Sequence, residues 1–228
     1  MNKTNFILSK DNVSNYKKNY EIIAHDNNIA DIVYKYIDKY GYGVDLNCID
    51  VSEVTDMSDV FSNQGFEGDV SEWDVSNVVK MDGMFAGCRK FNCNLSNWDV
   101  RNVKSMENMF QNCRVFNQPL ENWDVSSVEN MEDMFRGCHR FNQDLSKWDV
   151  RNVKDMNSMF INCLDFEGKG LKKWNVENVK DISNMFKFCY HFKEDLSKWK
   201  LNSCKDSIGF DVGTKSWEKN KKPFIKII

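Results

Sequence analysis

Hydrophobic positions recur along most of this chain with a period of about 25 residues. The unit FNQDLSKWDVRNVKDMNSMFINCLD at residues 141–165 is one of a set of near-copies, each carrying one tryptophan. Aligned on that residue, the copies form one column: Trp73, Trp98, Trp123, Trp148, Trp174 and Trp199. A self-similar period of this length is the signature of a repeat array, in which neighbouring units stack and share one core.

The pattern within one unit predicts a strand followed by a helix. From Leu95 to Val103 the apolar residues read L-x-x-W-x-V-x-x-V, which matches the strand pattern of leucine-rich repeats. From Val103 to Cys113 apolar residues follow spacings of 3, 3, 1 and 3, typical of one helix face. We therefore predict an α/β repeat fold. It is a right-handed, leucine-rich-repeat-like solenoid with one short parallel strand and one short helix per coil, capped at both ends.

The departures from the period divide the chain into three segments. Residues 1–45 are predicted to be a helical N-terminal cap, residues 46–204 a solenoid of about seven coils, and residues 205–228 a C-terminal cap. The cap helix is expected from Ile29 to Tyr40, where apolar residues recur at helical spacing before Gly41. A further short strand and helix are expected around Phe6–Leu8 and Tyr16–Ile23. The FEGKGL junction, which holds one extra residue, is expected to form a local bulge.

Composition narrows the classes of function. The 228 residues carry a net charge of −3, which leaves no electrostatic footprint for nucleic acid. No apolar run of about 18 residues occurs, so membrane insertion is not expected. The sequence as given shows no signal peptide, which favours the cytoplasm, and it is expected to be a monomer with a protein partner.

The residues that usually carry chemistry are not arranged as a catalytic or metal site in this sequence. Cys88, Cys113, Cys138, Cys163 and Cys189 occupy one repeat column, which favours buried, reduced thiols, although neighbours in a column could approach disulfide distance. The three histidines lie at unrelated positions, and no known metal or nucleophile motif is present. We therefore expect no enzyme activity, no cofactor and no metal.

The outward face of the predicted strands is the candidate site. Its central column contains five stacked aspartates, of which Asp99 is typical, and each can accept backbone N–H groups in the turn that follows. Alternatively the face binds a partner, with acidic residues toward the first coils and basic residues toward the last. A calcium ladder is a third reading, but single carboxylates per coil supply few oxygens. The candidate partner-binding residues are Asp74, Asp99, Asp124, Asp149, Arg101, Arg151, Lys147 and Lys173.

Units such as FNQPLENWDVSSVENMEDMF and FNQDLSKWDVRNVKDMNSMF resemble the BspA-like leucine-rich-repeat family of bacterial surface proteins, whose repeats also occur in mycoplasma proteins of unknown function. The resemblance covers roughly residues 44–204. It implies a leucine-rich-repeat-like solenoid, and several members are linked to adhesion at the cell surface. The leading hypothesis is therefore a non-enzymatic scaffold for protein binding or adhesion. The alternative is a structural component that self-assembles through its ends or through cysteines such as Cys48 and Cys93.

Overall fold

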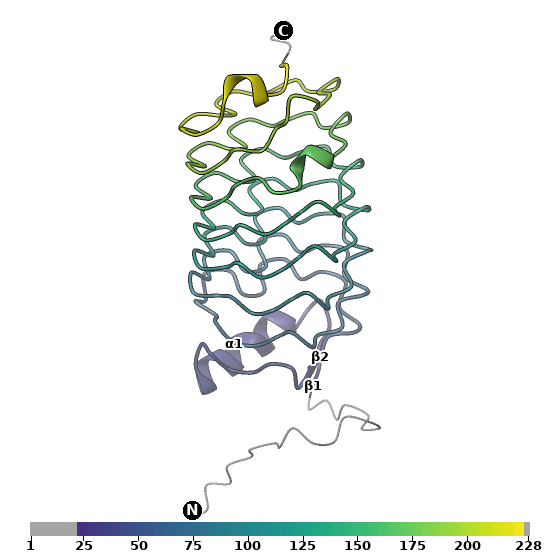
Figure 1. Cartoon of the computed structure of the whole chain (residues 1–228). Coiled ribbons are helices and arrows are strands. Elements are labelled where there is room, and N and C mark those ends of the chain that lie inside the picture. The colour runs from purple at the N-terminus through teal and green to yellow at the C-terminus, as the bar shows by residue number, and fades with distance from the viewer. Residues whose placement is uncertain (1–21, 226–228) are drawn as a thin grey trace, which may run out of the picture.

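The chain winds into a stack of similar coils with a helix across its first end (Figure 1). The computed structural model describes residues 22–225, so the strand and helix expected before Ile22 lie almost wholly outside the described residues. The assigned elements are β1 (Ile22–Ile23), α1 (Ile29–Tyr40), β2 (Ile49–Asp50) and the short 3-10 helices η1 (Leu171–Lys173) and η2 (Lys219–Lys221). Between β2 and the C-terminal end, the coils consist mainly of turns.

Backbone hydrogen bonds join successive coils along one side of the stack, which we call the ladder face (residues 105–113 and their equivalents). Met106 N donates to Asn130 O at 3.0 Å, and Phe110 N donates to Met134 O at 2.9 Å. Parallel bridges connect the equivalent residue of each coil along this face. They run through Asp56, Lys80, Ser105, Asn130, Asp155, Asp181 and Asp206. The ladder face therefore supplies the continuous backbone link along the stack.

The predicted helix of each coil is wrong, because residues 103–113 form consecutive turns. Met109 N donates to Met106 O at 3.2 Å and Cys113 N donates to Phe110 O at 2.9 Å, which are turn bonds rather than helical ones. Asn108 and Asn112 have φ of 55° and 61°, in the left-handed region that interrupts a helix. Alternate N–H groups can then point along the stack to the next coil, which a helix would not allow.

The predicted strand of each coil is also absent from the described coils after β2. Trp98 N donates to Leu95 O at 3.1 Å and Val103 N donates to Val100 O at 3.0 Å, so this segment bends at both ends. A parallel strand pair does occur at the first step, where Ile22 of β1 pairs with Ile49 of β2. We call the outward side of residues 95–103 and their equivalents the tryptophan face, since side chains carry most contacts between coils there.

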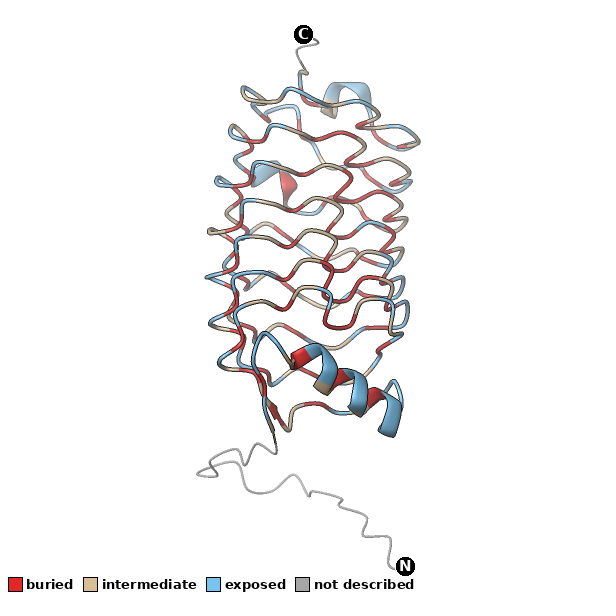
Figure 2. Cartoon of the chain, turned by 180° about the vertical axis from the view of Figure 1, so that it is seen from behind, coloured by how far each residue is buried: buried red, intermediate tan, exposed pale blue. Residues whose placement is uncertain are grey.

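The repeated apolar residues fill the interior of the stack (Figure 2). Trp98 and Trp123 lie 6.5 Å apart with ring planes inclined by 1°, and each indole N–H donates to a backbone carbonyl of an earlier coil. For Trp123 the acceptor is Leu95 O at 2.9 Å, which satisfies the buried indole N–H. Burying an aromatic side chain of this size contributes about 1.5–3 kcal/mol. The aromatic columns are therefore a main source of cohesion.

Both ends of the stack are covered. Helix α1 has the expected bounds, buries Ile29, Val33 and Ile37, and ends at Gly41, whose φ is 92°. At the other end, Trp217 packs edge-on against Phe192 with ring centroids 4.5 Å apart. The described part of the C-terminal segment contains η2 followed by an extended run, and residues 226–228 lie outside the described residues.

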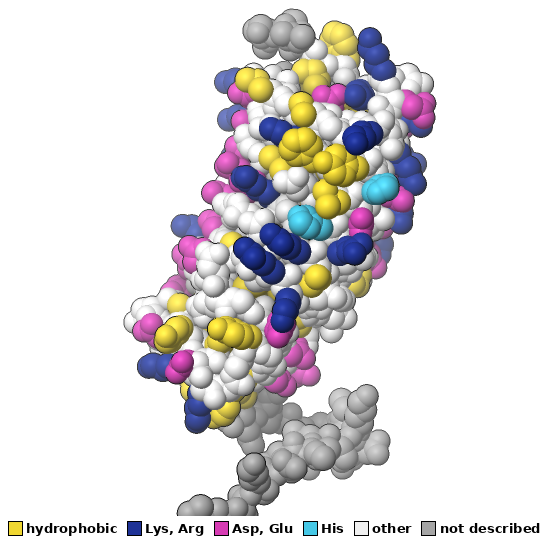
Figure 3. All heavy atoms as spheres, turned by 90° about the vertical axis from the view of Figure 1, so that its left-hand side faces the viewer, with side chains coloured by type: hydrophobic (Ala, Val, Ile, Leu, Met, Phe, Trp, Pro, Cys, Tyr) yellow, Lys and Arg dark blue, Asp and Glu magenta, His cyan; other side chains and the backbone are white. Residues whose placement is uncertain are grey.

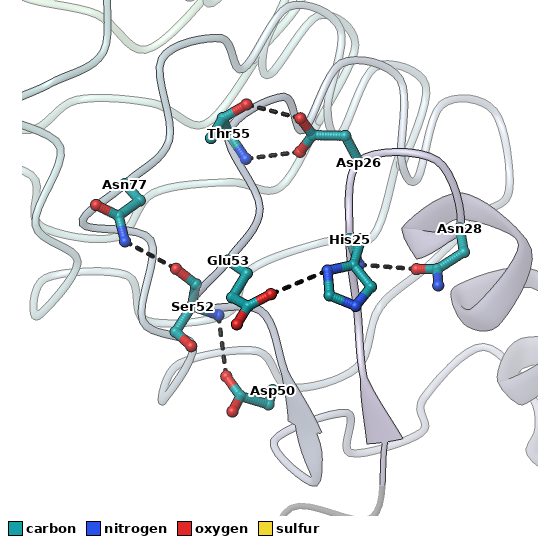
Figure 4. A network of polar contacts seen from close by, with 8 residues as sticks. All are labelled: His25, Asp26, Asn28, Asp50, Ser52, Glu53, Thr55 and Asn77. Atoms are coloured by element: carbon teal, nitrogen blue, oxygen red, sulfur yellow. Dashed lines mark hydrogen bonds and ion pairs between the residues drawn. The ribbon is translucent and has the colours of Figure 1, made fainter.

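Polar contacts attach the N-terminal cap to the first coil (Figure 4). The Asp26 carboxylate accepts hydrogen bonds from Thr55 N at 2.6 Å and from the Thr55 hydroxyl at 2.7 Å. His25 Nδ1 lies 3.1 Å from Glu53 Oε2. Because these contacts lie beside the β1–β2 pair, the cap is held in register with the repeats.

The junction with the extra residue forms a local bulge, as predicted. Gly168 and Gly170 have φ of 86° and 89°, and the chain then makes the single turn of η1. A Cβ atom on Gly170 would lie 2.4 Å from Ser146 N in the preceding coil. Glycine is needed there because the backbones of two coils approach closely.

Candidate partner-binding face

The aspartate column of the tryptophan face shapes the turn that follows it. Asp124 Oδ1 accepts a hydrogen bond from Ser126 N at 3.1 Å, and Asp74 Oδ1 accepts one from Ser76 N at 3.1 Å. Asn175, which replaces aspartate in a later coil, accepts the same bond from Glu177 N at 3.1 Å. The turn-forming role expected from the sequence is therefore confirmed. An amide oxygen can therefore close this turn in place of a carboxylate oxygen.

The two arginines of the candidate site pair with aspartates of their own coils. Arg101 Nε lies 2.8 Å from Asp99 Oδ1, and Arg151 Nε lies 2.9 Å from Asp149. The Arg101 guanidinium also has a raised pKa, caused first by the hydrogen bond to Asp99. The structure thus brings these predicted residues together in pairs within a coil. Their charges are already matched on the surface.

Asp74 and Asp124 remain more available to a partner, since both are exposed and no ion pair joins either one to a basic residue in the described chain. Hydrogen bonds from the Ser126 hydroxyl and amide lower the pKa of Asp124, and Arg101 of the preceding coil adds to this effect. Asp124 is consequently held as a carboxylate. It still has a second oxygen beyond the one that closes the turn.

The two predicted lysines lie apart from the aspartates of the column. Lys147 Nζ donates to Asn122 Oδ1 of the preceding coil at 3.0 Å. Lys173 is exposed in η1, next to the bulge, and its charge contributes to a lowered pKa at Asp144, which is caused first by the Ser146 amide. The structure therefore places the acidic and basic candidates on one face without gathering them into a single site.

Sequence reasoning missed a second acidic column, on the ladder face. Burial raises the pKa of Glu132, and the nearby carboxylates of Asp155 and Glu107 add to the effect. Burial also raises the pKa of Asp155, with a further contribution from Asp181. The signal was present in the acidic residue beside the first methionine of a coil, such as Glu107 beside Met106, but the predicted helix placed these residues on its solvent side. The pKa values of Glu132 and Asp155 are therefore raised, whereas that of Asp124 on the tryptophan face is lowered.

A third surface lies at the corner between the cysteine and phenylalanine columns, where basic and hydrophobic side chains gather (Figure 3). Arg89, Arg114 and His139 occupy successive coils there. Arg140 of the same corner pairs with Asp165 at 3.1 Å. Burial lowers the pKa of His139, and the charges of Arg114 and Arg140 lower it further. At neutral pH this histidine is therefore an uncharged member of a basic corner.

The cysteine column is buried and reduced in the structure. Each thiol donates to a phenylalanine carbonyl of an earlier coil, as Cys138 does to Phe110 O at 3.0 Å. Burial raises the pKa of the Cys88 thiol to about 11, so it is a poor nucleophile at neutral pH. Across residues 22–225, no group of three or more metal-binding side chains is close enough to hold an ion. No helix in the same range is long and apolar enough to cross a membrane.

Comparison with protein families finds one match. A profile described as "Mycoplasma protein of unknown function, DUF285" aligns twice, over residues 32–145 and 118–222. The two alignments overlap and together cover well over half of the chain, including most of α1 and nearly all repeats. Neither the curated proteins nor the solved structures contain a match.

Proposed function

We propose that this chain, which belongs to the Mycoplasma family of unknown function DUF285, is a non-enzymatic scaffold that binds a protein partner through its tryptophan face. In this proposal the coils form a right-handed solenoid of the leucine-rich-repeat class, related to the BspA-like repeats. Adhesion at a cell surface is the role that this relationship suggests. The proposal assigns no cofactor and no metal.

One observation supports this proposal most directly: the backbone of the tryptophan face repeats from coil to coil, whereas its exposed side chains differ. The tryptophans are at most 5% exposed and the aspartate turns repeat, so the backbone of the face is held rigidly. The residues beside the aspartates change from coil to coil. Before the aspartate they run from Glu72 through Asn97 and Asn122 to Lys147, Lys173 and Lys198. A rigid backbone with variable side chains suits recognition, since little conformational entropy is lost on binding.

The charges of this face define the partner that we expect. Because Arg101 and Arg151 are paired with Asp99 and Asp149, the candidate residues without an ion pair in the described chain are Asp74 and Asp124, together with Lys147 and Lys173 toward the last coils. A protein surface with basic residues at one end and acidic residues at the other would be complementary. Charge pairs of this kind mainly affect the association rate and its dependence on salt.

Because asparagine can replace aspartate in these turns, the role of the charges in partner binding can be tested without disturbing the fold. The substitutions Asp74→Asn and Asp124→Asn remove both charges but keep the turn, since Asn175 already forms it in the native chain. In a crosslinking screen against candidate surface proteins, we expect the double variant to lose binding by about tenfold while its unfolding curve stays close to the parent curve. Undiminished binding would contradict the assignment of this face.

A matched control separates binding from folding. Asp124→Ala removes the hydrogen bond to Ser126 N and should lower the free energy of unfolding by about 0.5–1.5 kcal/mol. Asp165→Asn changes an aspartate outside the tryptophan face, where the carboxylate pairs with Arg140. This control variant should bind the partner as well as the parent does.

A further inference from the structure

The two ends of the stack carry opposite charge. Residues 22–72 contain eleven Asp and Glu and two Lys, whereas residues 187–225 contain nine Lys and five Asp and Glu. These segments occupy opposite ends of the stack, with α1 at the acidic end and η2 at the basic end (Figure 1). The molecule therefore has an electrostatic polarity along its long axis, which can orient an approaching charged surface.

The basic end also presents unpaired backbone donors. In the preceding coil, Asn184 N donates to Ile208 O at 2.8 Å and Phe188 N donates to Val212 O at 2.7 Å. The equivalent N–H groups of the last coil belong to Gly209, Asp211 and Gly213, and they have no acceptor among residues 22–225. By the repeat of the ladder they point out of the end of the stack. Such a row of aligned N–H groups attracts negative charge.

A cavity of about 740 Å³ lies against this row of donors. It is bounded by the last coil, including Gly209 and Asp211, and by the C-terminal segment with Lys219 and Phe224. Phe224 is 82% exposed, and Ile208 of the same coil is 77% exposed. The basic end thus combines a hollow, backbone donors, a lysine and exposed apolar surface.

The acidic end presents a complementary stripe on α1. Asp31, Tyr34 and Asp38 are exposed and lie three and four residues apart, so they share one side of the helix. Tyr34 is 60% exposed and, with Asp38, borders a hollow of about 480 Å³. Because α1 lies across this end, the ladder itself cannot continue into another coil (Figure 2). Carboxylates are the acceptors that this end offers.

We propose that copies of this chain associate head to tail, with the α1 stripe of one copy seated in the cavity at the basic end of the next. The carboxylates of Asp31 and Asp38 would accept hydrogen bonds from the free N–H row and pair with Lys219. Tyr34 would pack against Phe224. This contact uses the ends of the stack and leaves the tryptophan face open, so it does not depend on the proposed function.

The polarity of the ends argues against a two-fold contact. Two basic ends would set donors against donors and lysines against lysines, and two acidic ends would set aspartates against aspartates. A head-to-tail contact is heterologous, and when it does not close into a ring it produces open chains of copies. Growth of the assembly with protein concentration is therefore expected.

Sedimentation velocity of the full chain in reductant provides the test. We expect the mean mass to rise with protein concentration in low salt and to fall at 0.5 M salt, where screening weakens the charge pairs. Asp31→Lys with Asp38→Lys, at one end, and Lys219→Glu with Phe224→Ser, at the other, should each weaken self-association by about tenfold or more. A chain that stays monomeric at every concentration would overturn the proposal.

Mixing the two variants distinguishes a head-to-tail contact from a two-fold contact. Each variant keeps one intact end, so the mixture should restore an association that neither variant shows alone. A two-fold contact between basic ends would leave the α1 variant fully associated, and that result would overturn the head-to-tail assignment. Asp74→Asn with Asp124→Asn should associate like the parent, so loss of partner binding and loss of self-association are separable. Circular dichroism confirms that each variant is folded.

Discussion

The ladder face and the tryptophan face of each coil hold the stack together by different means. On the ladder face, backbone groups bond directly between coils, as Asn108 N does to Glu132 O at 2.8 Å. On the tryptophan face, side chains bond to the backbone of an earlier coil. Asn102 Nδ2, for example, donates to Ser76 O at 2.7 Å. One face depends on backbone conformation and the other on side-chain identity.

This difference explains which residues repeat on each face. Trp, Asp and Asn recur on the tryptophan face because their side chains make the contacts between coils or close the turns. On the ladder face, two columns must adopt positive φ, and they contain mainly Gly, Asn and Asp, the residues that do so most readily. Outward residues of the ladder face differ from coil to coil, and some of them also bond to a neighbouring coil, as Asn130 Nδ2 does to Glu107 Oε2 at 3.1 Å. Substitutions should therefore have distinct consequences on the two faces.

The largest effect is expected on the tryptophan face, from Trp123→Ala. Trp123 is 2% exposed, stacks on Trp98 and donates to Leu95 O. Removing the indole leaves a large cavity and an unpaired carbonyl, which should lower the free energy of unfolding by about 3–5 kcal/mol. Urea denaturation followed by circular dichroism measures the loss.

Trp123→Phe is the matched control, because it keeps an aromatic ring but removes the indole donor. Its cost should be smaller, about 1–3 kcal/mol, and the difference between the variants reports how much the buried volume contributes. Equal losses in the two variants would show that the hydrogen bond, and not the packing, dominates this face.

A smaller effect is expected on the ladder face, from Gly137→Ala. Gly137 has a φ of 74°, and a Cβ atom there would lie 2.5 Å from Asn112 Oδ1 of the preceding coil. Backbone strain and the close contact should together lower the free energy of unfolding by about 1–3 kcal/mol. Thermal unfolding of the parent and the variant in the same buffer compares them.

Two further variants isolate the backbone contribution. In an Asn112→Gly background the close contact is gone, so Gly137→Ala should cost only about 1 kcal/mol, the penalty for the left-handed conformation. Gly43→Ala is a control outside the ladder, since Gly43 has open space around it. Its effect should be within about 0.5 kcal/mol. A Gly137 effect no larger than that of Gly43 would contradict the ladder description.

The sequence predicted the core and helix α1 well because both follow from apolar periodicity. Every repeated apolar column is buried, and α1 begins and ends where the spacing and Gly41 indicated. The internal structure of the coil was predicted wrongly, because i to i+3 turns give the same apolar spacing as a helix. The Gly, Asn and Asp residues at the Asn108 and Asn112 positions were the available signal, since they are poor helix formers.

The candidate site was only partly predictable, for a related reason. The turn role of the aspartates could be inferred because a side chain and the N–H two residues later are close in any such turn. The pairing of Arg101 with Asp99 follows from the same bend. The acidic column around Glu132 could not be placed, because its position depends on which residues of successive coils face each other. The hydrogen bonds of the ladder face set that register, and the predicted helix gave no indication of them.

The smallest predicted effect concerns the pH dependence of stability at one residue from each acidic column, Glu132 and Asp124. Glu132 on the ladder face has a raised pKa in the folded state, so the folded protein holds its proton more tightly than the unfolded chain does. Its contribution to stability therefore falls as pH rises through its unfolded and folded pKa values. Glu132→Gln should raise the free energy of unfolding at pH 7 by less than about 1 kcal/mol and have no such benefit near pH 3.

Asp124 on the tryptophan face should show the opposite sign. Its pKa is lowered in the folded state, chiefly by the Ser126 hydroxyl, so its contribution is present above the unfolded pKa and is lost as pH falls through the folded one. Asp124→Asn should therefore slightly reduce stability at pH 7 and converge with the parent in acid. Chemical denaturation of both variants from pH 3 to pH 8 measures the two slopes. The opposite slopes are expected because Glu132 is partly buried among carboxylates, whereas Asp124 accepts hydrogen bonds. Slopes of the same sign would mean that the two faces do not differ electrostatically.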